Sequence, residues 1–401
     1  MFFDWQPVSK RARLEPAMMS AAFLATEGRL CMGEVYRGNS RSALGEGSVR
    51  TMGSITAIFT AENHIHPAAE AILSESIAQG WSDPTKLHHP SRRLAQLLSE
   101  ARTSFATSLR VPSETIHFLG ESTLGFHLGI NGFPKDGDLF IPATSRQEVF
   151  AAIAGRPAKE LPVDINGRWD LPDGQREDLL VLQSVNLETG AIAPNVATFP
   201  GRVFVDATAD PLSRLPENWS ATLWDSTSWQ GPRGLGVFAL REHANWKNPL
   251  PHIDQRIVPG GVNPALVIAS AIALEASTAD RRASIINIEE FNSYIRSYLA
   301  TEIGDVDIAS PVNGAPHLLS FSFLYVQAEQ IVNGMEQRGF AIDSGSACIS
   351  ANIEASHVLA AMGRLTHGNI RIHLYPSTTR DDVEGLLKNL KDLVLEQRKS
   401  L

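Results

Sequence analysis

Short apolar runs, each bounded by turn-forming residues, recur along this chain and limit the fold that it can adopt. Five of these runs have the length of a strand buried on both faces: TIHFLG (115–120), DLFIPA (138–143), DLLVLQSVN (178–186), RVFVDA (202–207) and GLGVFAL (234–240). An apolar stripe at helical spacing from Leu94 to Leu109 predicts a helix ahead of them. Strands that alternate with amphipathic helices are typical of an α/β fold, in which helices cover a sheet.

The pattern changes near residue 260, where Pro and Gly cluster in NPLPHIDQRIVPGG and predict a domain boundary. Beyond it, we expect a helix over 265–277, a second helix near 288–300, a strand over 318–325, and a last helix from Arg380 to about Gln397. The sequence therefore predicts a large domain over 53–260 and a small C-terminal domain over 261–401.

The first 52 residues lack this regularity. They mix Arg, Ser, Gly and Met with little periodicity, and their acidic residues are atypical of a targeting peptide. We expect residues 1–52 to be a disordered extension or an incorrectly assigned start, with Met52 as the first residue of the protein.

Composition and charge exclude several classes of protein. Among 401 residues, 35 Lys and Arg face 44 Asp and Glu, and the net charge of −9 would repel a nucleic-acid backbone. No apolar run reaches the ~18 residues of a membrane span. The only two cysteines, Cys31 and Cys348, are far apart, which excludes a disulfide framework or a Cys-rich zinc site and favours the cytoplasm. No metal site is expected, because the His64 and His66 pair has no evident third ligand.

Three stretches carry candidate chemistry, and each also has an ordinary structural interpretation. Ser122 and Thr123 follow a strand where a helix should begin, an arrangement that binds phosphate but also caps helices. Asp206 ends a strand, where a carboxylate can hold a protonated ring nitrogen or can simply cap a turn. Cys348 stands in the small-residue loop SGSACIS, which favours an accessible thiol over a buried structural one.

From about Ile58 onwards the chain resembles the cysteine desulfurase family, class V of the fold-type I pyridoxal-phosphate (PLP) enzymes. The matching segments, in family order, are FTAENHIHP (59–67), SDPTKLHHPSRR (82–93), FLGEST (118–123), VNLETGAIAP (185–194), FVDAT (204–208), SGSACIS (344–350) and NIRIHLYPSTTRDDVEGL (370–387). The resemblance implies a large domain with a mostly parallel seven-stranded sheet and a smaller C-terminal α/β domain. It also implies a homodimer that binds PLP. By position it assigns cofactor binding to Ser122, Thr123, Asn186, Asp206 and Ser228, the substrate carboxylate to Arg371, and catalysis to Cys348.

The chain departs from the family where PLP is attached. Ser228 falls at the position of the Schiff-base lysine, and no lysine occurs between Lys159 and Lys247. Since a serine hydroxyl cannot form an imine, covalent attachment of PLP is not expected. Other family positions are also changed: Arg146 replaces the ring-stacking histidine, Leu187 the second Asn of its motif, and Asp225 and Thr227 the phosphate-binding Ser and His.

Four interpretations remain, and they leave open whether the chain is an enzyme. The retained SGSAC loop favours a desulfurase-like protein of sulfur mobilisation that acts through a Cys348 persulfide beside a degenerate PLP site. A second is a non-catalytic pseudoenzyme that partners or scaffolds an active desulfurase. A third is residual PLP-dependent desulfurase or lyase activity, and a fourth is that SGSAC only satisfies a local turn. We expect a homodimer or a heterodimer with a related desulfurase, and a sulfur-acceptor protein as a further partner.

Overall fold

The computed structural model describes residues 55–79, 82–153, 155–241, 245–252, 256–258, 261–345 and 355–399. The chain divides after Thr51 into two units, and all the described residues belong to the second. The predictions for residues 1–52 and for Cys348 lie outside the described residues.

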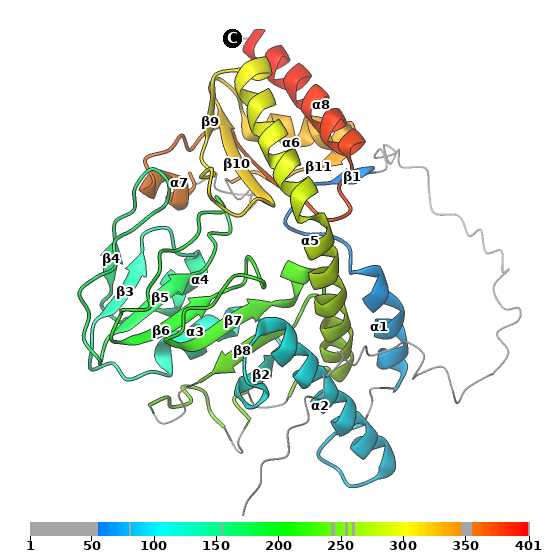
Figure 1. The fold of residues 1–401 in the computed structure, drawn as a ribbon, viewed down its shortest axis with the longest axis vertical. Coiled ribbons are helices and arrows are strands. Elements are labelled where there is room, and N and C mark those ends of the chain that lie inside the picture. The colour runs from blue at the N-terminus through cyan, green and yellow to red at the C-terminus, as the bar shows by residue number, and fades with distance from the viewer. Residues whose placement is uncertain are drawn as a thin grey trace, which may run out of the picture. The chain divides into compact units, whose positions relative to one another are not determined.

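A seven-stranded sheet forms the centre of the larger part of the fold (Figure 1). Its order is β2-β8-β7-β6-β5-β3-β4. The strands are β2 (Ile116–Leu119), β3 (Leu139–Pro142), β4 (Lys159–Leu161), β5 (Leu179–Gln183), β6 (Arg202–Asp206), β7 (Trp219–Asp225) and β8 (Gly236–Leu240). Only the pairings of β8 with β2 and with β7 are antiparallel within this sheet. The prediction of an α/β fold with a mostly parallel seven-stranded sheet is confirmed.

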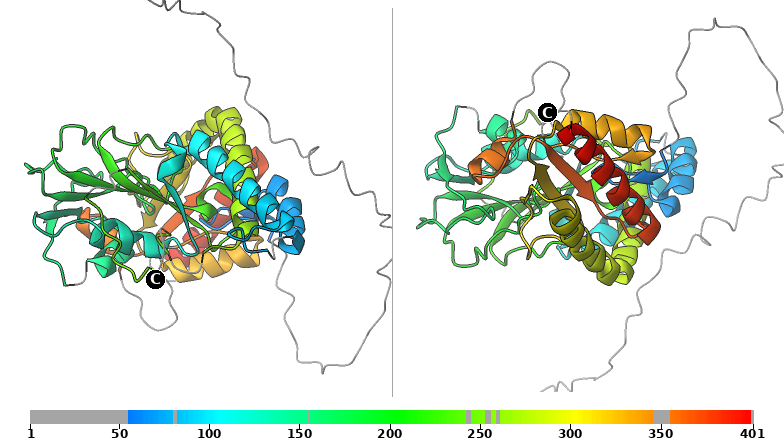
Figure 2. Two further views of the ribbon diagram at one scale, coloured as in Figure 1. Left: turned by 90° about the horizontal axis from the view of Figure 1, so that it is seen from below. Right: turned by 90° about the horizontal axis from the view of Figure 1, so that it is seen from above.

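Helices cover both faces of this sheet, because its strands are apolar on both faces. On one face, Leu180 and Leu182 of β5 join a core with α2 (His89–Leu109) and α5 (Pro264–Tyr298). On the other, Leu179 and Val181 join a core with α3 (Thr123–Asn131) and α4 (Gln147–Ala152). The left view in Figure 2, seen from below, shows α2 beside α5. Near them lie α1 (Pro67–Gln79), which packs on α5, and the single turn η2 (Ser113–Thr115).

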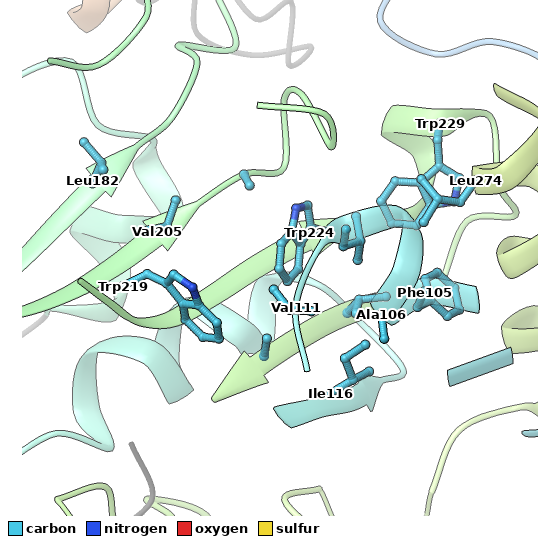
Figure 3. Close-up of a cluster of buried hydrophobic side chains, with 14 of the residues drawn as sticks. Phe105, Ala106, Val111, Ile116, Leu182, Val205, Trp219, Trp224, Trp229 and Leu274 are labelled. Atoms are coloured by element: carbon cyan, nitrogen blue, oxygen red, sulfur yellow. The ribbon is translucent and has the colours of Figure 1, made fainter. Parts of the chain in front are cut away.

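Three tryptophans strengthen the first of these cores (Figure 3). Trp219 and Trp224 belong to β7, and Trp229 ends the short 3-10 turn η3 (Ser226–Trp229) that follows it. The Trp229 ring packs edge-on against Phe105 of α2, with ring centroids 6.1 Å apart, and its indole N–H donates to the backbone oxygen of Ser270 at 3.2 Å. Burying such a ring stabilises the fold by about 1.5–3 kcal/mol, so η3 is held firmly against α5.

A second, smaller part is built on a three-stranded antiparallel sheet of order β12-β10-β9. Its elements are the π-helical turn η4 (Leu299–Ile303), β9 (Val306–Ile308), β10 (Leu318–Phe323), α6 (Ala328–Gln337), β11 (Phe340–Ala341), α7 (His357–Ala361), β12 (Asn369–His373) and α8 (Arg380–Lys399). The segment β1 (Ala57–Ile58) pairs in parallel with β11, and Ala57 and Phe59 join this core. The start of the described chain therefore packs with its C-terminal part.

One prediction of secondary structure differs from the structure, and one central strand was missed. The two helices expected over 265–277 and 288–300 are one continuous helix, α5, because the stretch between them contains neither Gly nor Pro to end it. Figure 1 shows α5 running from the large sheet to the small one. Strand β7 was not predicted, because Ser220 and Thr222 interrupt its apolar pattern even though both are buried.

Candidate functional site

The ends of β6 and β7 bring two carboxylates to one edge of the large sheet. The strands are parallel, Asp206 pairs in register with Leu223, and Asp225 ends β7 two residues later. Gly236 of β8 pairs with both Asp225 and Leu119 of β2, so the turn that follows β2 lies beside Asp225. This edge, formed by the carboxyl ends of parallel strands, is where ligands bind in open α/β sheets.

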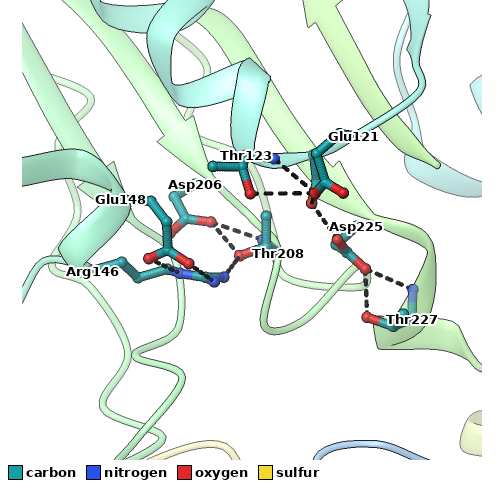
Figure 4. A network of polar contacts seen from close by, with 9 residues as sticks. Glu121, Thr123, Arg146, Glu148, Asp206, Thr208, Asp225 and Thr227 are labelled. Carbon is teal, nitrogen blue, oxygen red and sulfur yellow. Dashed lines mark hydrogen bonds and ion pairs between the residues drawn. The ribbon is translucent and has the colours of Figure 1, made fainter. Parts of the chain in front are cut away.

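The predicted phosphate-binding residues, Ser122 and Thr123, stand at the start of α3 as expected, but carboxylates of the chain are bound there (Figure 4). The Ser122 hydroxyl donates to Asp225 Oδ2. The backbone N–H and the hydroxyl of Thr123 lie 3.3 Å and 3.2 Å from Glu121 Oε1. The positive end of a helix favours such a negative charge, so the chain itself supplies the anion at this position.

Asp225 is also held on its other side. Its Oδ1 accepts hydrogen bonds from the backbone N–H of Thr227, at 2.8 Å, and from the Thr227 hydroxyl. The Asp225 carboxylate therefore has three donors within the chain. A phosphate at this turn would face Glu121 and Asp225 together, and like charges at such short range repel strongly in a partly buried site.

Asp206 keeps one carboxylate oxygen free of hydrogen bonds. The residue is 1% exposed, and its Oδ1 accepts from the N–H and the hydroxyl of Thr208 at 3.0 Å and 2.6 Å. Oδ2 is buried with no hydrogen-bond partner among the described residues. Burial raises the pKa of Asp206, while the nearby Arg146 guanidinium opposes that rise. A carboxylate of this kind suits a protonated ring nitrogen.

Arg146 occupies the position that the resemblance gives to a ring-stacking histidine, and it is tied to its neighbours. Its Nη1 donates to Thr208 Oγ1 at 2.7 Å, and its Nη2 lies 2.6 Å from Glu148 Oε1. The guanidinium carbon lies 5.5 Å from the centre of the Phe126 ring. Burial disfavours the charge on Arg146, but the carboxylates of Asp206 and Glu148 outweigh burial and raise its pKa. Figure 4 shows this group beside Asp206.

Asn186, predicted to contact the cofactor, has its amide fully engaged within the chain. Its Nδ2 donates to the Thr144 backbone oxygen at 3.0 Å and to Gln183 Oε1 at 2.9 Å. Its Oδ1 accepts from the backbone N–H groups of Glu188 and Thr189 at 3.0 Å and 2.9 Å. The arrangement fixes the turn after β5, and a cofactor contact of Asn186 stays a prediction.

Ser228, predicted to stand at the lysine position, lies in η3 and is half-buried. Its hydroxyl donates to the backbone oxygen of Asp225 at 2.8 Å. The side chain thus braces the turn that carries Asp225. The correspondence of Ser228 with a Schiff-base lysine stays a prediction.

Arg371, predicted to bind a substrate carboxylate, lies in β12 of the smaller part. Its Nη2 is 3.7 Å from Asp343 Oδ2, and its Nε is buried with no hydrogen-bond partner among the described residues. Burial raises the pKa of the nearby Glu188, and the Ser356 hydroxyl and Arg371 oppose the rise. Residues 346–354, with Cys348, are outside the described residues, so the structure does not relate Cys348 to Arg371.

Sequence analysis missed several residues that shape this edge. Glu121 had a readable signal, because an acid directly before a Ser-Thr helix start is well placed to interact with the helix dipole. Thr208 had one too, since Thr two residues after Asp often closes a local turn. Glu148 and Glu188 had no readable signal. Their charged neighbours, Arg146 and Arg371, are directed toward them only in the folded chain.

Neither a metal centre nor a membrane span is found in the described part of the chain. No group of three or more His, Cys, Asp or Glu residues is arranged there to hold a metal ion. No helix in the same residues is both long and apolar enough to cross a bilayer. His66, half of the histidine pair noted in the sequence, has its Nε2 3.2 Å from Asp280 Oδ2.

Comparisons with known proteins agree with this fold. The family described as aminotransferase class-V matches residues 230–386. A solved structure described as a NifS-like protein superposes with a TM-score of 0.75 at 20% identity, over 85% of this chain and 99% of that one. A NifS-like protein from Rickettsia africae gives 0.73 at 18% identity, over 84% and 99%. The fold is therefore that of the NifS-like solved structures.

Curated sequences similar to this chain include several cysteine desulfurases. Cysteine desulfurase IscS of Dictyoglomus turgidum is 27% identical over 368 residues, which cover 83% of this chain and 92% of that protein. Cysteine desulfurase NifS of Azotobacter vinelandii is 24% identical over 270 residues, or 62% and 67% of the two chains. Over most of its length the chain is therefore similar to cysteine desulfurases.

Cysteine desulfurases and class-V aminotransferases generally depend on PLP, so the described residues can be tested against that cofactor. The free oxygen of Asp206 fits the ring nitrogen. The start of α3 does not fit the phosphate, because Glu121 and Asp225 already accept its donors. Taken together, the described residues do not fit PLP as a bound group.

Proposed function

We propose that this chain is a sulfur carrier of the cysteine desulfurase family, which holds sulfur as a persulfide on Cys348 and carries out no PLP chemistry of its own. The observation that supports this proposal is the pair of carboxylates, Glu121 and Asp225, that accept the donors at the start of α3. Ser228 in place of a lysine gives further support. The family cysteine loop is kept in the sequence while its cofactor site is altered.

The proposed transfer balances without an outside oxidant or reductant. The Cys348 thiolate attacks the outer sulfur of a persulfide on a donor protein. A new S–S bond forms at Cys348, the S–S bond of the donor breaks, and the donor cysteine leaves as a thiolate. Transfer to an acceptor protein repeats the same exchange in the other direction.

The donor in this proposal is an active, PLP-dependent desulfurase. It would either form a heterodimer with this chain or bind transiently to a homodimer of this chain. Arg371 would contribute an anion contact, because its buried Nε has no hydrogen-bond partner among the described residues. The thiolate form of Cys348 is required, since the thiol is a poor nucleophile.

A second candidate function is that of a non-catalytic partner or scaffold. It is favoured by the self-contained polar contacts of the sheet edge, where Asn186 and Asp225 are satisfied within the chain. Such an edge keeps its structure without a ligand, as a scaffold requires. In this case the Cys348 loop would serve docking and carry no sulfur.

The test is transfer of labelled sulfur from cysteine, through an active desulfurase, to the purified full chain. The chain offers a matched control because Cys31 is its only other cysteine. We expect label on the wild type and on Cys31→Ser, its release by a thiol reductant, and its loss from Cys348→Ser. If Cys348→Ser were labelled as strongly as the wild type, or if the wild type were not labelled, the sulfur-carrier proposal would be overturned.

Two further readouts separate the alternatives. A Cys348→Ser variant that still restores function in a deletion strain would support the scaffold. The visible spectrum after addition of PLP and then L-cysteine should remain blank for the carrier and for the scaffold. A cofactor band that responds to cysteine would favour residual PLP-dependent activity over both the carrier and the scaffold.

A further inference from the structure

A pocket away from the sheet edge described above gathers four arginines. It has a volume of about 670 Å³, within the range of small-molecule sites. Its walls are the end of α2 with Arg110, the loop 211–217 that follows β6, Arg241 just beyond β8, and Arg282 of α5. The one acidic residue in its lining is Glu217.

This concentration of positive charge runs against the composition of the chain, which carries a net charge of −9. The guanidinium groups of Arg110, Arg214 and Arg282 form no hydrogen bond or ion pair with the described residues. The four arginines are exposed and outnumber the one acid, Glu217, in the lining. Like charges that line one cavity repel one another, and an anion placed between them removes that cost.

One of the arginines is oriented by its surroundings. Arg241 donates from Nη1 to the backbone oxygen of Glu217, and its guanidinium carbon lies 5.3 Å from the centre of the Trp219 ring. Its plane is thereby fixed while its other N–H groups remain available. A planar guanidinium held in this way can bind a phosphate group through two parallel hydrogen bonds.

The loop that forms one wall is pinned at both ends. At its start, the half-buried Asp210 pairs with Arg281 of α5 at 2.8 Å, and Asp210 Oδ1 accepts from the Leu212 N–H at 3.0 Å. At its far end, Asn218 Nδ2 donates to the backbone oxygens of Val196 and Phe199, each at 3.0 Å. Because the wall is preformed, a ligand would lose little free energy in ordering it.

From these observations we infer that the pocket binds a small anion with at least two phosphate groups, independently of the sulfur chemistry proposed above. Four guanidinium groups match the charge of a diphosphate better than that of a single carboxylate. Apolar lining from Leu109, Leu212 and Leu215 leaves room for an uncharged part of the ligand. The shared chemistry is the diphosphate, whether free or part of a nucleotide.

The test is calorimetric titration of the full chain with inorganic pyrophosphate and, separately, with ADP at near-physiological salt. The variants are Arg214→Gln, Arg282→Gln and the double variant. The matched control is Arg93→Gln, an exposed arginine near the other end of α2. We expect the double variant to weaken pyrophosphate binding at least tenfold and Arg93→Gln to change it less than twofold.

The two ligands distinguish the sources of the diphosphate. Tighter binding of ADP than of pyrophosphate would show that the apolar lining contacts the nucleoside part of a nucleotide. Equal binding would show that the site recognises the diphosphate alone. The inference is overturned if neither ligand binds the wild type. It is equally overturned if the double variant and the Arg93→Gln control bind alike, and unchanged melting temperatures would show that the variants are folded.

Discussion

The hydroxyl of Ser122 donates to the carboxylate of Asp225, across 103 positions of sequence. Ser122 stands directly before α3 and Asp225 ends β7, so this bond joins a helix start to a strand end at the carboxyl edge of the sheet. Together with Glu121 it places two negative charges where the family resemblance predicts a phosphate. The family resemblance and the chemistry of this edge therefore point to different activities.

Removing both carboxylates should restore affinity for phosphate. In a Glu121→Ala/Asp225→Ser variant, the N–H of Thr123 and the hydroxyl of Ser122 lose their internal acceptors. We expect inorganic phosphate and PLP to bind at least tenfold more tightly than to the wild type, since tenfold corresponds to about 1.4 kcal/mol. Equilibrium dialysis measures this affinity. Glu160→Ala, at an exposed acid on β4, is the control, and equal affinity in all three proteins would contradict the prediction.

Arg146 and Glu148 should prove energetically coupled. Arg146→Ala leaves the Glu148 carboxylate without its 2.6 Å partner and removes a donor from Thr208. Since both side chains keep some solvent exposure, we expect a loss of about 1–3 kcal/mol in the free energy of unfolding. The double variant Arg146→Ala/Glu148→Ala should lose about 1 kcal/mol less free energy of unfolding than the two single variants lose together. Urea unfolding of the four proteins measures the coupling, and strict additivity would refute it.

Gly236 should tolerate no side chain. A Cβ built there would lie 2.8 Å from Ser122 Cα, which is a backbone atom with little room to move, whereas a Cβ on Gly120 would meet nothing within 4 Å. We expect Gly236→Ala to cost about 1–3 kcal/mol and Gly120→Ala to stay within about 0.5 kcal/mol of the wild type. Thermal unfolding measures both. Similar melting temperatures for the two variants would argue against this close approach of β8 to the start of α3.

Stability should fall in mild acid because of a half-buried histidine. Burial lowers the pKa of His317 from 6.5 to about 4, Arg281 adds to the effect and Asp210 opposes it. Between these values the unfolded chain takes up a proton that the folded chain does not. Neutral His317 therefore makes its full contribution to the free energy of unfolding above about pH 6.5. That contribution, up to about 3 kcal/mol, is lost as the pH falls toward 4.

A His317→Gln variant tests this dependence, since its amide oxygen can still accept from Arg281. We expect its free energy of unfolding to vary less with pH over that range than that of the wild type. His252→Gln, at an exposed histidine, is the control. If the wild type and His317→Gln showed the same pH profile by urea unfolding, His317 would not be the group responsible.

The sequence by itself determined five of the seven strands of the large sheet and one strand of the small sheet, because β2, β3, β5, β6, β8 and β10 are local apolar runs bounded by turns. It also determined that Ser122 and Thr123 start a helix and that Asp206 ends a strand. It failed where local signals are weak, at β7 and at the unbroken α5, because burial of Ser220 and Thr222 and the span of a helix across two cores depend on distant contacts.

Only the tertiary structure decided what the site residues meet. Asp225 reaches Ser122, Arg146 reaches Thr208, and Arg282 lines the same pocket as Arg214, although each pair is far apart in sequence. Sheet order and register set these encounters, and no local pattern encodes them. A strand end or a helix start can therefore be read from sequence, but whether it offers a donor to a ligand or to the chain itself depends on packing.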